Sequence, residues 1–176
     1  MTEILDYPYL VIVLALGIFS IIGGIHVVPE YQRLVVFRLG RYLDKPKGPG
    51  IAFLVPMIDR AVKVDLREQK REISNQEATT KDFIPVFADF RWYYKVLDPI
   101  KAVVSVGNVE ATTAGIISTK LRKIIHEINA GDLLSEHERI RYEISTDTSL
   151  REVFENLGVI VTRFEILKLS AADRKK

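Results

Sequence analysis

An uninterrupted apolar stretch near the N-terminus constrains this chain more than any other feature. Residues 8–28 contain no Asp, Glu, Lys or Arg. As a helix they would extend about 30 Å, which matches the hydrocarbon thickness of a bilayer. The sequence therefore predicts a short N-terminal tail (1–7) and a transmembrane helix (8–28). A cleaved signal or a buried core helix is the alternative, although the acidic start and the length do not suit a signal peptide.

The charges that flank this stretch predict its orientation. No Lys or Arg precedes it, whereas five basic residues follow it closely: Arg33, Arg38, Arg41, Lys45 and Lys47. Cytoplasmic flanks carry such an excess, so we expect a single-pass protein of the cell membrane with its main domain in the cytoplasm. Arg33 and Arg38 are also candidates for contact with anionic headgroups. Ordinary solvated strand residues are the alternative reading of both.

Three small residues within the stretch share one helical face. Gly17, Ser20 and Gly24 are spaced three and four apart, and small side chains allow two membrane helices to approach closely. The spacing predicts a packing face between copies of the chain. Glycine is frequent in membrane helices in any case, so composition alone is the alternative explanation.

The residues after the stretch have the pattern of β-strands. In "RAVKVDLRE", apolar Val62, Val64 and Leu66 alternate with charged neighbours, as in a strand with one buried face. The preceding segment "GIAFLVPMI" is apolar and follows a Gly-Pro-Gly turn. We expect Phe53, Leu54 and Ile58 to contact the membrane surface, in the manner of an amphipathic anchor. Burial of all three in a core is the alternative.

A longer alternation and several helix signals follow. Even-numbered apolar residues from Ile84 to Val96 predict a strand whose aromatic side chains pack in a core. Asp98 before Pro99 and then Asn108 predict two helix starts, the second leading into a helix of about 109–129. Ser135 predicts a third helix that ends at Gly158, and "VIVTRFEILKL" predicts a final strand. Strand, helices and strand in this order predict a crossover unit with helices on one face of a small sheet.

Several classes of function have no support in the sequence. The chain has no cysteine, which excludes disulfides and thiolate ligands, and its three histidines lie in separate segments. No catalytic or metal-binding motif is present, so the sequence predicts no enzyme activity, no metal and no cofactor. A net charge of +2 with interleaved signs predicts no nucleic-acid partner.

The order of several phrases resembles one protein family. These are "EYQRLVVFRLGRYL", "KGPGIAFLVP", "VKVDLRE", "NQEATTKDFIPVFADFRWYYKVLDP" and "LGVIVTRFEILKL". They are similar to the stomatin/prohibitin/flotillin group, whose shared unit is the SPFH or band 7 domain, and stomatin-like members resemble them most. The resemblance implies an α+β fold: a β-rich membrane-proximal half (29–78) and an α/β distal half (79–170).

The resemblance also implies a function. Members of the group assemble into ring- or cage-like homo- or hetero-oligomers, organise lipid microdomains, and bind and regulate client membrane proteins such as proteases. The expected partners are therefore the lipid bilayer, other family members and client membrane proteins. A non-ring adaptor or accessory subunit of another membrane complex is the alternative.

The sequence departs from the family pattern in two places. Members normally continue from the last strand into a long Ala- and Glu-rich helix, whereas this sequence ends in a short charged tail (171–176). Either the chain continues further, or it assembles through the domain alone or on a longer partner. Asn156 and Leu157 stand where stomatins often have a tryptophan, so the packing at the end of the third helix is expected to differ.

Overall fold

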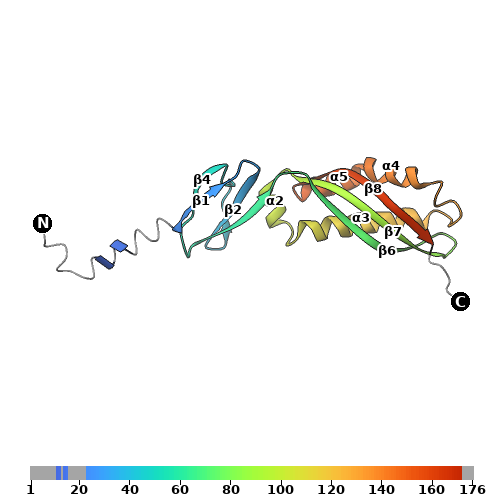
Figure 1. Cartoon of the computed structure of the whole chain (residues 1–176), viewed down its shortest axis with the longest axis horizontal. Coiled ribbons are helices and arrows are strands. Elements are labelled where there is room, and N and C mark those ends of the chain that lie inside the picture. The colour runs from blue at the N-terminus through green and yellow to red at the C-terminus, as the bar shows by residue number, and fades with distance from the viewer. Residues whose placement is uncertain (1–10, 13, 16–22, 172–176) are drawn as a thin grey trace. The chain divides into compact units, whose positions relative to one another are not determined.

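The computed structural model describes residues 11–12, 14–15 and 23–171. The chain divides into two compact units, Met1–Leu66 (unit 1) and Arg67–Lys176 (unit 2). This division precedes the predicted boundary at residue 78, because the segment 69–79 forms a strand that pairs along its length with a strand of unit 2. Each unit has its own sheets (Figure 1).

Unit 1 is built from short antiparallel strands. They are β1 (Ile25–Val28), β2 (Gln32–Arg38), β3 (Arg41–Tyr42), β4 (Gly50–Phe53) and β5 (Asp59–Asp65). β1 pairs with β4, and a separate sheet has the order β3-β2-β5. A small buried cluster joins the two: Val28, Leu34, Val36, Ala52 and Leu54.

The predicted transmembrane helix (8–28) extends too far, because residues 25–28 form strand β1. Most of the predicted span (residues 8–10, 13 and 16–22) lies outside the described residues. Among the residues that are described, no helix is both long and apolar enough to cross a membrane.

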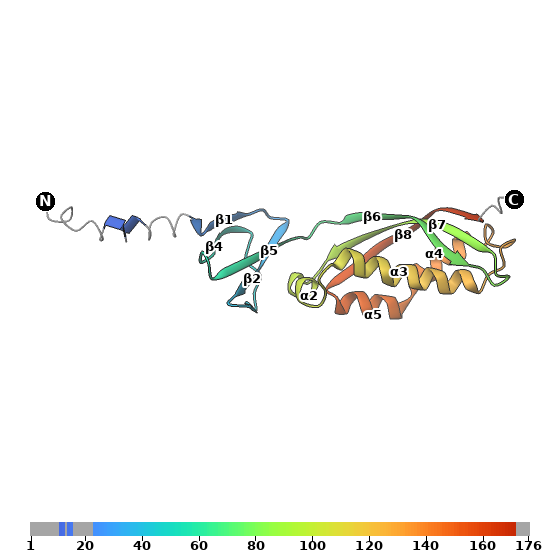
Figure 2. The ribbon, with the colours of Figure 1, turned by 90° about the horizontal axis from the view of Figure 1, so that it is seen from below.

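Unit 2 is a three-stranded antiparallel sheet with helices on one face (Figure 2). Its strands, in the spatial order β6-β7-β8, are β6 (Gln69–Thr79), β7 (Pro85–Val96) and β8 (Val159–Ala171). Its helices are α2 (Pro99–Val104), α3 (Val109–His126), α4 (His137–Thr146) and α5 (Thr148–Asn156). The predicted alternation in β7 is confirmed, since its even-numbered side chains from Val86 to Val96 are all buried. Ile84 precedes the strand and is partly exposed.

The predicted crossover unit is wrong in its direction, because β7 and β8 pair antiparallel. A single helical pass between strands returns the chain to its starting end and gives parallel pairing. Here α3 returns the chain to the start of β7, where Lys81 N donates to Ile128 O. The segment containing α4 and α5 then runs back, so that Val159 pairs with Val96. Two passes instead of one make the sheet antiparallel.

The helix starts are confirmed at two positions and corrected at the third. The Asp98 carboxylate accepts hydrogen bonds from the amides of Ile100 and Lys101, and the Asn108 side chain accepts one from Ala111. The predicted single helix from Ser135 is instead two helices, α4 and α5, which separate at Asp147. Ser135 makes no cap, because its hydroxyl donates to Asp132 O, 2.7 Å away.

Candidate membrane-facing surface

One face of the β1–β4 ribbon is apolar and open to its surroundings. The register places Ile25 opposite Phe53 and Val27 opposite Ile51. Residues opposite each other in an antiparallel pair point to the same side, so these four side chains form one surface, which we call the β1–β4 face. Their exposed fractions are 52% and 45% for the first pair and 77% and 81% for the second. A water-facing ribbon would normally place polar residues here.

The opposite side of the ribbon packs on the core of unit 1. Val28 and Ala52 are buried there. Gly24 lies against the ribbon at the entry to β1: a Cβ at this position would be 2.4 Å from Leu54 O and 2.7 Å from the ring of Phe53. Gly24 thus allows β4 to approach, a role that the predicted helix-packing face did not include. The other two residues of that predicted face, Gly17 and Ser20, lie outside the described residues.

The structure separates the three apolar residues predicted to touch the membrane. Phe53 and Ile58 are 45% and 43% exposed, but Leu54 is buried in the cluster between the sheets. Leu54 is therefore a core residue, because successive side chains of an extended segment point to opposite sides. Sequence reasoning placed Ile25 and Val27 in the transmembrane helix and did not single out Ile51, because the face that they share depends on the pairing of β1 with β4. Periodicity within these two short segments does not reveal the pairing, so the sequence offered no clear signal for this face.

A second apolar group lies at a turn of the other sheet of unit 1. Leu39 N donates to Ile58 O at 3.3 Å, which joins the β2–β3 turn to the segment before β5. Leu39 and Met57 have left-handed φ values of 50° and 67° and are almost fully exposed. This conformation is uncommon for residues other than glycine, and such strain concentrates at functional sites. We call Leu39, Met57 and Ile58 the β2–β5 tip.

An ion pair holds the β2–β5 tip in place. Arg38 Nε and Nη2 donate to the two carboxylate oxygens of Asp59, at 2.7 and 2.8 Å. Asp59 also accepts a hydrogen bond from Val55 N, which fixes the segment that carries Met57. The hydrogen bond from Arg38 is the main cause that lowers the pKa of Asp59, and the same contact raises the pKa of Arg38. The Asp59 carboxylate therefore stays ionised at any physiological pH.

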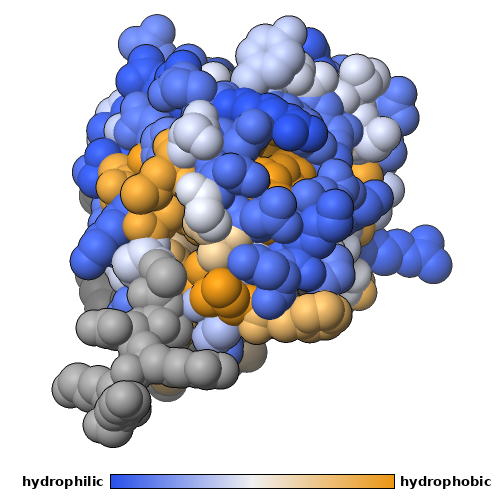
Figure 3. Space-filling model, turned by 90° about the vertical axis from the view of Figure 1, so that its right-hand side faces the viewer, coloured by the Kyte–Doolittle hydropathy of each residue, from blue (hydrophilic) through white to orange (hydrophobic). Residues whose placement is uncertain are grey.

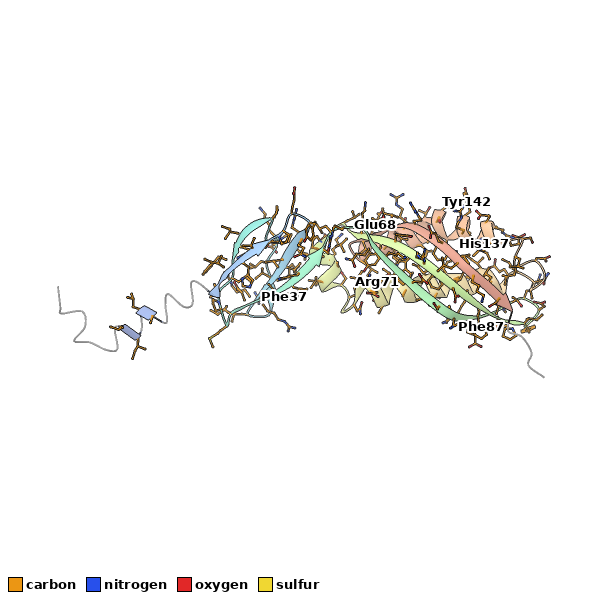
Figure 4. All side chains as sticks on the ribbon, viewed as in Figure 1. Phe37, Glu68, Arg71, Phe87, His137 and Tyr142 are labelled. Carbon is orange, nitrogen blue, oxygen red and sulfur yellow. The ribbon has the colours of Figure 1, made fainter. Side chains whose placement is uncertain are left out.

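The two arginines predicted to contact headgroups both have acceptors within the protein. Arg38 is bound by Asp59, and Arg33 Nη1 donates to the carbonyls of Glu30 and Gln32 at 2.8 and 2.7 Å. Their contact with lipid remains a prediction. Figure 4 shows the side chains of both units.

One hollow of unit 2 has charged residues in its lining, and these already have partners. This hollow of about 280 Å³ lies between α5 and β8, and its polar lining includes Asp147 and Arg151. Asp147 already binds Lys120, and Arg151 binds Glu155. Within the described part of the chain, no three His, Asp or Glu side chains come together in a way that could hold a metal ion.

Comparison with known proteins assigns the chain to a family. The family described as "SPFH domain / Band 7 family" matches residues 26–174. Stomatin-1 of Caenorhabditis elegans is 40% identical over 84% of this chain and 44% of its own length. A stomatin homolog of Pyrococcus horikoshii is 38% identical over 88% of this chain and 57% of its own, and mouse stomatin 35% identical over 81% and 50%. The chain spans about half the length of these curated relatives. With this match and these identities, the chain belongs to the SPFH domain / Band 7 family, among the stomatin-like proteins.

Proposed function

We propose that this chain is a membrane-anchored scaffold that assembles into a ring or cage, organises a membrane microdomain, and binds or regulates client membrane proteins such as proteases. The N-terminal apolar segment is the anchor, and the domain lies on the cytoplasmic side. The chain acts by holding lipids and proteins in place, without catalysis.

The β1–β4 face is the observation that carries this proposal. Four large apolar side chains on one ribbon are 45–81% exposed, and the first strand of the ribbon, β1, is the last part of the apolar segment 8–28. Exposed apolar groups of this kind mark contact with a membrane or another protein. In the interfacial layer of a bilayer, these side chains leave water while the buried side of the ribbon keeps its packing.

The β2–β5 tip supports the same conclusion. Leu39 and Met57 are presented to the surroundings at a backbone cost, and the Arg38–Asp59 pair keeps them there. Contact with water alone does not explain why two apolar residues are held exposed in a left-handed conformation.

The depth of the β1–β4 face in a bilayer tests the anchoring. Because the chain has no cysteine, Ile51→Cys in the full chain gives a single site for an NBD fluorophore. In reconstituted liposomes we expect blue-shifted NBD emission that is quenched by lipids with a spin label near the headgroup. Tyr142→Cys, on an exposed position of α4 in unit 2, is the matched control and should stay unquenched (Figure 4). Equal, water-like emission from both sites would contradict membrane contact by this face.

The mass and shape of the native particle test the scaffold. We would purify the full chain from its membrane in mild detergent and measure it by mass photometry and negative-stain imaging. A ring or cage far heavier than one 20.0 kDa chain supports the proposal. A particle of one or two copies would overturn the ring and favour the adaptor.

A further inference from the structure

Gly115 is a glycine that the fold of unit 2 does not need. It lies in the middle of α3, where glycine costs about 1 kcal/mol relative to alanine. A Cβ added at Gly115 would meet nothing within 4 Å. By contrast, Gly158 has a φ of 75° and a Cβ there would lie 2.5 Å from Asp98 O. Packing within unit 2 therefore does not require a glycine at position 115. Close approach of a group outside unit 2 to α3 would require one, because a side chain at this position would block it.

Gly115 lies in the wall of an apolar groove between α3 and α5, the two helices seen side by side in Figure 2. The groove has a volume of about 550 Å³. Small or β-branched side chains form most of its walls: Ala111, Thr112, Ile116 and Thr119 from α3, and Val153 from α5, with Leu150 beside it. Val153 is 42% exposed, so it projects as a ridge beside the groove.

The two helices that border this α3–α5 groove carry opposite charges. Lys123 lines the α3 side, and Glu152 is exposed on α5. Lys120 also lines the α3 side, but it is bound to Asp147 within the chain at 2.6 Å. Arg151, also on α5, is paired with Glu155 at 2.9 Å. A helix pair with the same charge layout fits this surface when α5 of one pair faces α3 of the other. A copy laid with α3 on α3 would instead bring like charges together.

The edges of the sheet are less suited to contact between copies. The β6–β7 register shifts between Ile73 and Gln76, and the β7–β8 register shifts at two further places. Bulges on edge strands disturb the ladder that another chain would have to extend. Figure 3 views the structure from the right-hand side of Figure 1, where apolar side chains form small groups among polar ones.

We propose that the α3–α5 groove is a contact between two copies of this chain, in which α5 of each copy lies over α3 of the other. The proposal rests on the scaffold function and names the surface through which copies meet. The Val153 ridge of one copy approaches Gly115 of the other, and Lys123 faces the acidic side of the partner's α5. The two-fold axis lies parallel to the helices, so Arg67, the start of unit 2, is at the same end in both copies.

That orientation suits two chains anchored in one membrane. Anchoring also raises the effective concentration, so that a contact of modest area is sufficient. The contact is isologous, and larger assemblies need a second surface in addition.

Cross-linking between two different full-length variants tests the geometry. One chain carries Gly115→Cys and the other Val153→Cys, with different tags, so that a disulfide between the tags forms only between chains. In liposomes we expect at least about tenfold more cross-linked product from this mixture than from Gly115→Cys mixed with Tyr142→Cys, which is equally free to diffuse. Equal yields from the two mixtures would overturn the proposal.

Substitutions at open glycines test the energetics. Gly115→Leu fills the groove without a clash inside unit 2, so it should fold and yet weaken self-association of the reconstituted chain by at least about tenfold. Gly107→Leu is the matched control, because a Cβ at Gly107 also meets nothing within 4 Å but lies outside the groove. The fluorescence of Trp92, the one tryptophan of the chain, verifies folding of each variant. Unchanged association of a folded Gly115→Leu chain would contradict the proposal.

A charge exchange provides a rescue. Lys123→Glu and Glu152→Lys should each weaken association when made alone, and the double variant should recover it. Absence of any recovery would count against the proposed pairing of α3 with α5. Failure here is distinct from failure of the scaffold function: a heavy particle that Gly115→Leu leaves intact refutes only this contact, whereas a light particle that does not touch lipid refutes the function.

Discussion

The β1–β4 ribbon of unit 1 and the β6-β7-β8 sheet of unit 2 each pack one face on a core, but their other faces differ in chemistry. The outer face of β7 carries Arg91, which pairs with Glu72 at 2.9 Å and Glu165 at 3.6 Å. Beside it, Arg163 lies 5.3 Å from the ring centre of Tyr93. Such charged contacts tolerate water well. The outer face of the ribbon has only apolar side chains.

The two units are therefore stabilised in different ways. Unit 2 buries large side chains between its sheet and helices, among them Phe90, Trp92 and Phe164. Unit 1 has a small buried cluster and leaves several large apolar residues outside it. Substitution of outward apolar residues should therefore affect function in unit 1, and substitution of buried residues should affect stability in unit 2.

The largest loss of stability is expected in the core of unit 2. The Phe90 ring is fully buried, with its centre 5.8 Å from that of Trp92 and 5.7 Å from that of Phe164. Phe90→Ala removes these contacts and leaves a cavity, so the free energy of unfolding should fall by about 3–5 kcal/mol. Urea titration followed by Trp92 fluorescence measures this change. A loss below about 1 kcal/mol would mean that this core repacks easily.

A smaller loss is expected at the entry to the β1–β4 ribbon. Gly24→Ala places a methyl group against Leu54 O, whereas Gly23→Ala, its neighbour, places one in open space. Because Leu54 N donates to Gly24 O at 2.8 Å, the clash should open the ribbon. We expect amide hydrogen exchange of residues 51–54 to accelerate about tenfold, equal to about 1.4 kcal/mol, in Gly24→Ala only.

Equal amide hydrogen exchange in the two variants would contradict this role of Gly24 and favour the predicted one, helix packing in the membrane. In that case, Gly24→Ala should change the mass of the particle in detergent and leave residues 51–54 protected.

How much of this could be predicted from the sequence depended on how local each feature is. The caps at Asp98 and Asn108 were predictable, since each acts on amides two or three residues away. The break at Asp147 was not, because one of its carboxylate oxygens caps α5 while the other binds Lys120 on α3 at 2.6 Å. The β1–β4 face likewise depends on pairing across more than twenty residues, which periodicity within each short strand does not reveal.

A fall in pH should weaken the ion pair between Lys120 and Asp147 in unit 2. The hydrogen bond from Lys120 lowers the pKa of Asp147 relative to the unfolded chain, where it is about 3.9. The pair thus stabilises unit 2 fully above about pH 4, and the stabilisation declines as pH falls toward the lower folded pKa. Asp147→Asn keeps a side chain that can cap α5 but removes the charge. We expect it to reduce the fall in Tm between pH 5 and pH 3, followed by Trp92 fluorescence.

The matched change in unit 1 is Asp59→Asn, which removes the charge that binds Arg38. Because Trp92 reports on unit 2, this variant should leave the acid dependence of that transition as it is in the unsubstituted chain. If both variants changed it equally, the two units would unfold as one, and the comparison between them would fail.

The smallest change in stability is expected for Ile51→Ser, on the β1–β4 face. The Ile51 side chain is 81% exposed, so its removal should alter the free energy of unfolding by no more than about 0.5 kcal/mol. The same substitution deletes apolar surface that would leave water in the interfacial layer, worth about 0.8 kcal/mol per buried methylene. Amide hydrogen exchange of residues 25–28 in liposomes measures the contact of the β1–β4 face with the bilayer. This exchange should accelerate in Ile51→Ser. Phe83→Ser, at an equally exposed apolar position of unit 2, should leave this exchange unchanged, because Phe83 lies outside the surface assigned to the membrane. If Ile51→Ser instead destabilised the chain in detergent as much as a core substitution does, the ribbon would be packed against protein, and its apolar face would be an interface between chains.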